Sequence, residues 1–535
     1  MRNGAFGLVL ACLAGGWLLH CMGGMDASDV PPEDGGTRDE SEVGADTPSD
    51  DGGSTDVETD MPEGPDPVCN ADELHQALMD AQDGDAMVLI GAECVIEGTF
   101  EVPAGVSLWG SSGSVLATPE AGDVRRPVLT LQTGADTTAV QNLTIRSSSN
   151  YGIVAVGDGS GAVLLKDLLV EATRGVAVGL EGLASVELTN LTLDGSHTAT
   201  ELRRADPSLA DPGVEATHGL VVVRGGHATI DGLTIRGFAV IGGVLIDDDI
   251  AWSTGVLERN GLAGLVTHGV TATLTGLELR GLRSPHAFPL DTTFDETRSW
   301  TGPPTFGAVF LGDSVVETVG VSMERGLHFG LAHDGGEATH DGLTVRECGD
   351  TGVWAQDVRS LTLQGTTDAR ALLEGNHFAG VMLYEPDAAT ITNVDVVGTE
   401  YGCHGCGTLD EVQAGDGIQV VLPKTSLQLS GIDLVDNARI GLLLDMGGAS
   451  MSGVTVMDLE VSATDVAYGA YAQNATGMEE WDAAVERLGP LAGYDNALDG
   501  ELLPIGGRLP PKAFPAVSRL TRGGLVGIID PMPPS

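Results

Sequence analysis

Positively charged residues are scarce in this chain. Of its 535 residues only 26 are Lys or Arg, against 77 Asp or Glu, and the formal net charge at pH 7 is −51. Nucleic-acid binding needs Lys and Arg contacts to phosphates, so the composition argues against that class of function. The same charge argues against unassisted binding of polyanionic glycans or anionic lipid surfaces.

Long apolar runs are equally scarce, and the one at the N-terminus, Gly4–Leu19, is short for a membrane span. It follows Arg2 and ends before Cys21, which is the pattern of an export signal. The stretch "LLHC" resembles a bacterial lipobox, in which the Cys is lipidated, although His20 stands where a small residue is expected. We expect residues 1–21 to be a lipoprotein-type signal peptide; ordinary signal cleavage is the alternative.

Residues 22–68 hold almost nothing apolar. Their acidic, low-complexity composition predicts a disordered tether that self-repulsion keeps extended. A lipid anchor at Cys21 followed by such a tether would suit a domain displayed at the outer membrane or cell surface. A periplasmic or freely secreted domain with a solubilising spacer is the alternative.

Glycine, by contrast, is abundant, and it marks a repeat. An apolar residue, a charged residue, five free positions and a glycine recur, as in Ile235–Arg236–Gly242 and Val345–Arg346–Gly352. Most successive anchors are separated by 22 to 24 residues. The glycine anchors are residues 152, 175, 219, 242, 264, 307, 330, 352, 380, 417, 441 and 469.

A period near 22 residues with short β-branched runs and turns between them is typical of a parallel β-helix. Alternation within one run sends Leu233 and Ile235 inward and Thr234 and Arg236 outward. Leucine-rich repeats would show a regular Leu/Asn consensus, and helical arrays would show a 3.6-residue period. Neither pattern is present.

At this point the chain from about Cys69 to Ala475 resembles the right-handed, pectin-lyase-like β-helix proteins. The stretch "ADELHQALMDAQDGDAMVLIGAECVIEGTFEVPAGVSLWGSSG" resembles their entry, a capping helix followed by a "GD" turn and the first coils. The resemblance implies an all-β, single-stranded right-handed parallel β-helix over residues 69–475, of twelve or thirteen coils and roughly 60 Å long. Residues 476–535 would form a C-terminal cap and tail. This superfamily includes lyases, hydrolases, epimerases, tailspikes and adhesins, so the fold does not settle the function.

The outward charged position forms a ladder along the stack. Its signs nearly alternate, so each arginine lies beside a carboxylate of a neighbouring coil. Arg236 is therefore interpreted as structural rather than catalytic. The members are Arg146, Glu171, Asp194, Arg236, Glu258, Arg280, Glu324, Arg346 and Glu374. Asn260, Asn376 and Asn437 are interpreted as stacked turn residues, with Cys348 in the same slot.

The outward position of the strand after each glycine anchor is apolar instead of polar. This line predicts an exposed apolar stripe, which marks an interface, a binding groove or a covered surface. Three insertions, Ser196–His218, Arg283–Phe306 and Thr399–Asp416, interrupt the coil at the same corner. They would either wall a groove beside the stripe or lie flat over it as a lid.

The second insertion is the richest in carbohydrate-contact chemistry, meaning planar polar groups and an aromatic platform. The glycan- or partner-binding candidates are Arg283, His286, Arg298, Trp300, Trp354, Met382 and Tyr384. Asp291 and Asp295 are weak catalytic candidates, because hydrolysis needs two positioned carboxylates. Ordinary loop polarity explains the same residues.

Metal and cysteine chemistry is sparse. Asp247 and Asp249 are weak candidates for Ca²⁺, whose coordination geometry is permissive. A disulfide Cys69–Cys94 would pin the capping helix to the first coils. For Cys403 and Cys406 a short-loop disulfide is favoured over zinc, because only His404 is nearby as a third ligand.

Two classes of function remain. The first is an exported, surface-anchored protein that binds a polysaccharide or a surface protein along the loop-walled face, touching the membrane only through its lipid anchor. The second is a polysaccharide lyase, hydrolase or epimerase that uses residues 283–306. The first is favoured, because no convincing acid–base pair appears in the sequence.

Overall fold

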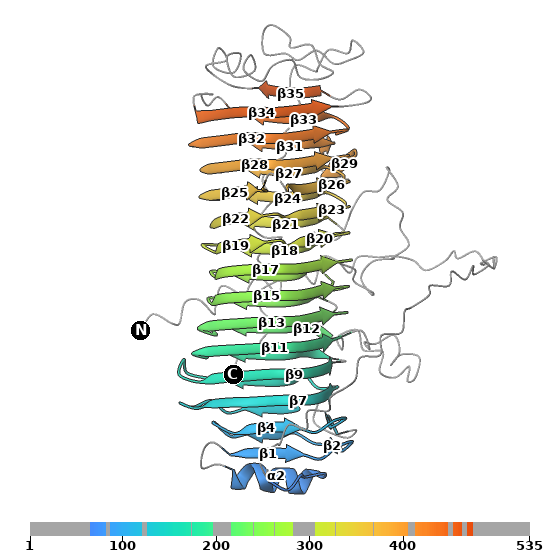
Figure 1. Ribbon diagram of the computed structural model, residues 1–535, viewed down its shortest axis with the longest axis vertical. Helices are drawn as coiled ribbons and strands as arrows, with labels where there is room; N and C mark the ends of the chain where they lie inside the picture. Colours follow the sequence, from blue (N-terminus) through green and yellow to red (C-terminus); the bar gives the residue numbers. More distant parts are fainter. Residues whose placement is uncertain are drawn as a thin grey trace, which may run out of the picture. The chain divides into compact units, whose positions relative to one another are not determined.

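The computed structural model describes residues 65–81, 86–119, 126–172, 174–195, 216–238, 240–261, 263–281, 305–326, 328–366, 369–404, 412–447, 453–462 and 468–473. These residues form a right-handed parallel β-helix, as the sequence predicts (Figure 1). The predicted signal peptide, residues 22–64 of the predicted tether and the chain beyond residue 473 lie outside the described residues. The last residue of the predicted tether, Val68, pairs with Ile90 and so belongs to the β-helix. The described residues contain no helix with the length and apolarity needed to cross a membrane.

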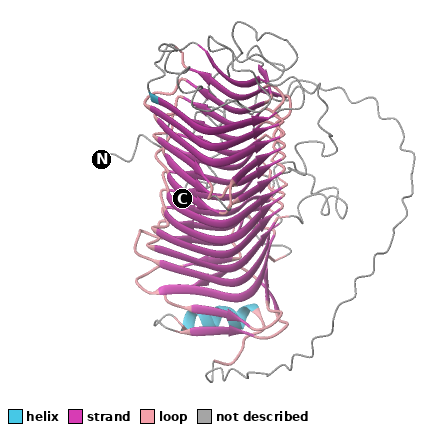
Figure 2. Ribbon diagram, turned by 45° about the horizontal axis from the view of Figure 1, so that its top comes forward, coloured by secondary structure: helices cyan, strands magenta, loops and turns pink. Residues whose placement is uncertain are grey.

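Two long sheets of parallel strands make up the stack (Figure 2). Sheet A has 19 strands and sheet B has 14. The strands of sheet B are β3 (Phe100–Val102), β6 (Leu129–Leu131), β8 (Tyr151–Val156), β10 (Gly175–Glu181), β12 (Ala216–Val223), β14 (Ile241–Ile246), β16 (Ala263–His268), β18 (Phe306–Leu311), β21 (Phe329–Asp334), β24 (Thr351–Gln356), β27 (Ala379–Tyr384), β31 (Asp416–Val421), β33 (Ile440–Asp445) and β35 (Tyr468–Gln473).

Sheet A holds the remaining parallel strands. They are β1 (Met87–Ile90), β2 (Val95–Glu97), β4 (Ser107–Gly110), β5 (Val115–Ala117), β7 (Thr137–Ser147), β9 (Ala162–Ala172), β11 (Ser185–Asp194), β13 (His227–Arg236), β15 (Asp249–Glu258), β17 (Thr271–Arg280), β19 (Val315–Val319), β20 (Ser322–Glu324), β22 (Glu337–Asp341), β23 (Thr344–Arg346), β25 (Ser360–Gln364), β26 (Ala371–Glu374), β28 (Ala388–Val397), β32 (Ser426–Val435) and β34 (Val454–Ser462). A small antiparallel pair, β29 (Gly402–His404) and β30 (Val412–Ala414), lies within the third predicted insertion.

Long strands of sheet A supply two legs of a coil, because each turns a corner at one left-handed residue. In β13 that residue is Gly232, with φ of 64°. The same place in β11 and β15 is taken by Asn190 and Thr254, with φ of 54° and 50°. Glycine and asparagine tolerate this conformation best, so a line of such residues places one corner of every coil above the last.

The interior of the stack is one apolar core that runs from Leu74 to Leu459. Leu233 and Ile235 are fully buried in it, and Thr234 and Arg236 point outward, as the alternation predicts. No coil encloses its own apolar face, so each is stabilised by the coils above and below it.

Each of the twelve glycine anchors lies in a strand of sheet B, and eleven of them share the predicted register. Gly175 does not, because Ala177 takes the place between Gly152 and Gly219. For most of them the reason is crowding, whereas Gly175 has a left-handed backbone with φ of 63°. A Cβ on Gly330 would overlap Val345 and come within 2.6 Å of the carbonyl oxygen of Gly352. Strands β3 and β6 have no such anchor, and for this reason sheet B has 14 strands where twelve or thirteen coils were expected.

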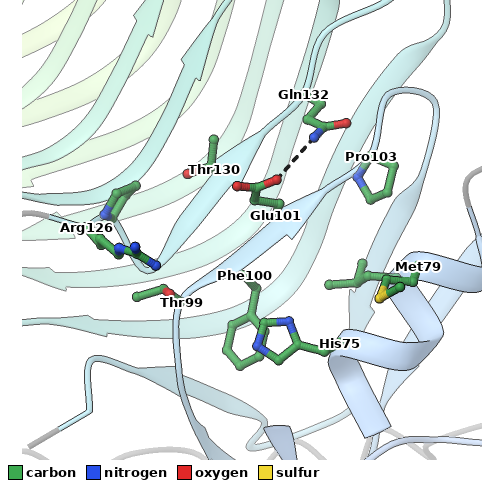
Figure 3. A pocket seen from close by; sticks show the side chains of 11 residues that line it. His75, Met79, Thr99, Phe100, Glu101, Pro103, Arg126, Thr130 and Gln132 are labelled. Carbon is green, nitrogen blue, oxygen red and sulfur yellow. Dashed lines mark hydrogen bonds between the residues drawn. The ribbon is translucent and has the colours of Figure 1, made fainter. Parts of the chain in front are cut away.

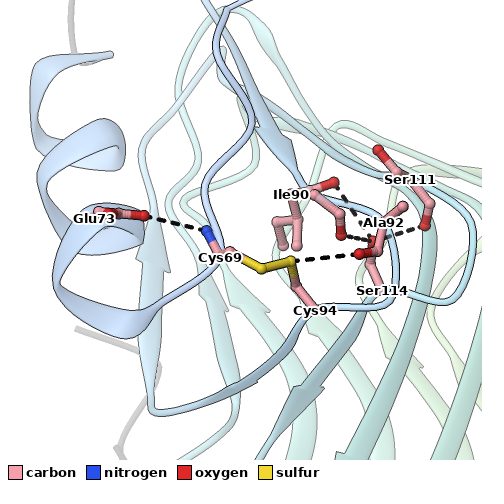
Figure 4. Close-up of a disulfide and its surroundings, with 8 residues drawn as sticks. Cys69, Glu73, Ile90, Ala92, Cys94, Ser111 and Ser114 are labelled. Atoms are coloured by element: carbon pink, nitrogen blue, oxygen red, sulfur yellow. Dashed lines mark hydrogen bonds between the residues drawn. A yellow bond between two sulfur atoms is a disulfide. The ribbon is translucent and has the colours of Figure 1, made fainter.

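The N-terminal end of the stack is closed by helix α2 (Ala71–Asp80). Asn70 caps it, because its side-chain oxygen accepts a hydrogen bond of 2.9 Å from the backbone N–H of Glu73. Leu74 and Leu78 are buried against the first coils. The predicted disulfide Cys69–Cys94 ties the residue before the N-cap to the turn after β1 (Figure 4).

The charge ladder has the predicted register along sheet A, from Arg146 to Glu374. Arg146 pairs with Glu171 at 2.7 Å, and Arg236 donates two hydrogen bonds to Asp194, at 2.9 and 2.7 Å. The hydrogen bonds from Arg236, reinforced by the charge of Asp194, raise the pKa of its guanidinium. Arg236 therefore joins neighbouring coils, as its structural interpretation requires.

Candidate functional site

The outer face of sheet B is the surface that the sequence singles out. One outward residue per strand forms a line along it, which the register of the strands defines: Glu101, Thr130, Val154, Gly179, Val221, Val244, Val266, Val309, Ala332, Trp354, Met382, Gln419 and Leu443. From Val221 to Leu443 every member is at most 2% exposed. The expectation of an exposed apolar stripe is therefore wrong over this stretch, which has the burial of a covered face. Apolar side chains in such a line are stabilised by leaving water.

Aromatic side chains reinforce this buried stretch. The rings of Phe306 and Phe329 stack with centroids 5.1 Å apart, and Phe329 meets Trp354 edge to face at 5.6 Å. Trp354 and Met382 are fully buried, so neither of these candidates presents surface to a ligand. Tyr384 is partly exposed, and burial followed by the charge of Glu385 raises the pKa of its phenol.

The remaining candidates belong to the second predicted insertion. Arg283, His286, Asp291, Asp295, Arg298 and Trp300 lie outside the described residues. Cys406 lies outside them as well, and nothing is described of the Cys403 side chain.

The three consecutive aspartates after β14, Asp247 to Asp249, differ in their burial. Asp247 and Asp249 are exposed, and Asp249 pairs with His227 at 3.0 Å. Asp248 between them is buried and accepts a hydrogen bond from the backbone of Gly225. Burial raises the pKa of Asp248 to about 6, against these backbone hydrogen bonds. Within the described ranges no group of three or more His, Cys, Asp or Glu side chains could hold a metal ion.

The N-terminal end of the same outer face is open, and a pocket of about 550 Å³ lies there (Figure 3). Strands β3 and β6 supply Glu101 and Thr130, and helix α2 closes one side with His75 and Met79. The volume is within the range of small-molecule sites. The sequence reasoning missed this pocket, because no motif connects its residues.

Two charged groups face the pocket. The Glu101 carboxylate accepts a hydrogen bond of 3.2 Å from the side-chain amide of Gln132. Arg126 is exposed and makes no ion pair with any described residue. Most described arginines, such as Arg236 and Arg439, pair with carboxylates, and Arg174 and Arg259 are the other described arginines without an ion pair to a described residue. The Arg126 guanidinium is therefore available to a ligand.

A ring platform forms the side of the pocket next to α2. The imidazole of His75 lies against the ring of Phe100, with centroids 4.9 Å apart and planes tilted by 41°. Phe100 is 1% exposed, so it supports His75 from below while His75 itself is exposed. Gly98 makes room for this arrangement, because a Cβ there would overlap the Phe100 ring.

Beyond the pocket the open surface ends within two strands. Val154 is partly exposed, and at Gly179 the ring of Tyr151 lies over the strand, 3.6 Å from where a Cβ would be. Burial and the charge of Glu181 raise the pKa of Tyr151. The buried stretch begins with Val221 on the next strand.

Chemically, the pocket offers hydrogen-bond donors and acceptors beside aromatic rings, which can bind a small polar molecule. Glu101 is the single carboxylate among the described residues that line it. Hydrolysis of a glycosidic bond needs two positioned carboxyl groups. The described geometry therefore fits binding and offers no hydrolytic pair.

No known protein family and no curated protein matches this sequence. Among solved structures, tailspike protein 3 of bacteriophage CBA120 is similar at 11% identity and a TM-score of 0.29, with 73% of this chain and 56% of the tailspike covered. The family 28 exopolygalacturonase of Yersinia enterocolitica is similar at 10% identity and 0.31, with 75% of each chain covered. The catalytic domain of a GH87 α-1,3-glucanase in complex with nigerose is similar at 10% identity and a TM-score of 0.29, with 75% of this chain and 66% of the glucanase domain covered. The chain thus spans little more than half of the tailspike.

Proposed function

We propose that this protein is a saccharide-binding β-helix protein that uses the pocket between α2, β3 and β6, without hydrolysing its ligand. The observation that carries the proposal is Arg126, a guanidinium with no ion pair among the described residues, in a pocket with the Glu101–Gln132 pair and the His75 platform. Planar polar groups beside a ring match hydroxyl groups and the apolar face of a sugar ring.

A neutral saccharide is favoured over an acidic one. Glu101 faces the ligand and would repel a sugar carboxylate, and the whole chain carries a net charge of −51. Sugar hydroxyls would instead donate hydrogen bonds to Glu101 and accept them from Arg126.

The cellular setting of the proposal rests on the sequence. Export, lipidation at Cys21 and an acidic tether over residues 22–68 would present the β-helix at a membrane surface facing glycans. Mass spectrometry of the protein from cell membranes tests this part: a diacylated Cys21 at the N-terminus supports anchoring, and a cleaved N-terminus without lipid contradicts it.

The experiment for the function is a panel of neutral and uronic oligosaccharides, titrated by calorimetry and then analysed for new reducing or unsaturated ends. We expect binding of neutral sugars and no new ends. Arg126→Ala should weaken binding about tenfold or more, since one charged hydrogen-bond partner contributes about 1.5–3 kcal/mol.

Arg325→Ala is the matched control, because it removes an exposed arginine that pairs with Glu347, outside the pocket. Equal losses in the two variants, or no binding at all, would contradict the proposal. New chain ends would replace binding by catalysis as the function.

A further inference from the structure

The pocket lies at a closed end of the outer face, and this geometry limits what can enter it. On one side α2 stands across the line of outward residues, with the His75 ring and Met79 at the pocket wall (Figure 3). Leu74 and Leu78 hold α2 against the first coils, and the disulfide Cys69–Cys94 fastens its N-terminal end. A ligand therefore cannot continue along the sheet past α2.

The open surface is also short in the opposite direction, along sheet B away from α2. Among the outward residues whose exposure is described, Glu101, Thr130 and Val154 in succession are open to solvent, and the line is buried from Gly179 to Leu443. At Gly179 the Tyr151 ring lies over the strand, and Val221 on the next strand is fully buried. Strands in such a sheet are about 4.8 Å apart, so β3 to β10 span about 14 Å of surface.

We infer that the pocket takes the end of a neutral saccharide chain, with the terminal ring between α2 and β6 and contacts to about three rings in all. The inference rests on the proposed saccharide binding and adds selectivity for chain ends. A ring contacts roughly one strand spacing, so a fourth ring finds no open outward residue. The middle of a long chain would need to leave the pocket on both sides, and α2 blocks one of them.

Tyr151 and Gly179 form the far limit of the contact region. Gly179 lacks a left-handed backbone, and a Cβ there would meet only the Tyr151 ring, at 3.6 and 3.8 Å. Gly179→Leu therefore adds bulk on the outer face without forcing the coil apart. It should obstruct the third ring of a bound chain and leave the first untouched.

The test is calorimetric titration with neutral gluco-, manno- and xylo-oligosaccharides of one to six units. In the wild-type protein we expect affinity to rise up to about three units and then to stay constant within about twofold. In Gly179→Leu the affinity for the trisaccharide should fall about tenfold, and that for the monosaccharide should stay within about twofold. A thermal melt of the variant that matches wild type confirms its fold.

Size-fractionated neutral glucans supply a second measurement, namely the number of proteins bound per chain. End-on binding predicts a number that does not depend on chain length. Affinity that keeps rising to six units, or a stoichiometry proportional to length, would overturn the end-on inference while saccharide binding stood. If no oligosaccharide of any length binds, the proposed function itself fails.

Discussion

At the scale of single residues, two histidines in the interior show how strongly burial controls protonation here. The Nε2 atoms of His333 and His340 are 2.9 Å apart, and Nδ1 of His340 is 2.8 Å from the hydroxyl of Thr318. Burial lowers the pKa of His340 to about 3, and burial together with His340 lowers the pKa of His333. Both rings are therefore neutral in the folded protein.

A pH dependence of stability follows. The unfolded chain binds protons at these histidines below pH 6.5 and the folded chain does not, so their contribution is complete above pH 6.5 and declines as the pH falls. Each histidine should cost up to about 1.4 kcal/mol per pH unit below 6.5. Denaturant melts between pH 7 and pH 5 measure this loss.

The double variant His333→Leu with His340→Leu isolates the effect. Its melts should show a clearly smaller slope with pH than the wild type, because other titrating groups are common to both proteins. His227→Gln, which changes an exposed histidine, should keep the wild-type slope. Identical slopes in the double variant and the wild type would mean that these histidines are protonated in the fold.

Replacing Trp354 tests whether the outer face of sheet B at this position is buried or exposed to a ligand. Because it is fully buried against Phe329, Trp354→Ala should lower the free energy of unfolding by about 3–5 kcal/mol. Saccharide affinity should be unchanged within error in titrations well below the melting temperature. A variant with normal stability and lost binding would instead restore Trp354 as a ligand contact.

At the scale of elements, the charge ladder joins strands of neighbouring coils. Arg236 on β13 holds Asp194 on β11, whose side chain is 4% exposed. Arg236→Ala should cost about 1–3 kcal/mol of unfolding free energy, since a buried carboxylate loses its charged partner. Arg325→Ala, from a pair with both side chains exposed, should cost about 0–1 kcal/mol. Chemical denaturation compares the two, and equal costs would contradict the interpretation of the ladder.

Helix α2 is the element that connects stability with the pocket. Cys69→Ala with Cys94→Ala should lower the free energy of unfolding by about 2–4 kcal/mol. It should also weaken saccharide binding, because α2 supplies the His75 wall. The wild type should respond to a reductant in the same way, and the variant should not respond. Reduction that leaves binding intact would show that the pocket does not depend on this disulfide.

The strands that carry the repeated glycine pattern could be predicted from the sequence, and the strands without that pattern were missed. Most glycine anchors follow from crowding that recurs from coil to coil, so twelve strands of sheet B could be recognised from the spacing of their glycines. Strands β3 and β6 contain no glycine and therefore give no such signal. The disulfide was predictable from the export signal and the two cysteines beside the capping helix.

The site was far less predictable. His75, Glu101 and Arg126 come from a helix, a strand and a turn, and only the stacking of the first coils brings them together. The burial of the outer face likewise depends on tertiary packing, which an alternating sequence pattern does not reveal. The sequence pattern of an outward apolar residue is the same whether its side chain faces water or is covered by protein.

At the scale of the whole molecule, the described residues form one continuous stack with an open, polar pocket at its N-terminal end and a buried apolar outer face beyond it. The net charge of −51 disfavours polyanionic ligands, and the pocket presents the guanidinium of Arg126, which makes no ion pair with a described residue. Function is thus assigned to an end of the solenoid rather than to its middle, where the sequence had directed attention.

The central claim is that this end binds a saccharide. Its most direct measurement is the dissociation constant for the best neutral oligosaccharide of the panel, in Glu101→Gln with Arg126→Ala and in Glu347→Gln with Arg325→Ala. The two double variants make the same chemical changes, the first in the pocket and the second at an exposed pair outside it. We predict that binding is lost in the pocket variant and unchanged in the other. Equal affinity in both variants would contradict the claim.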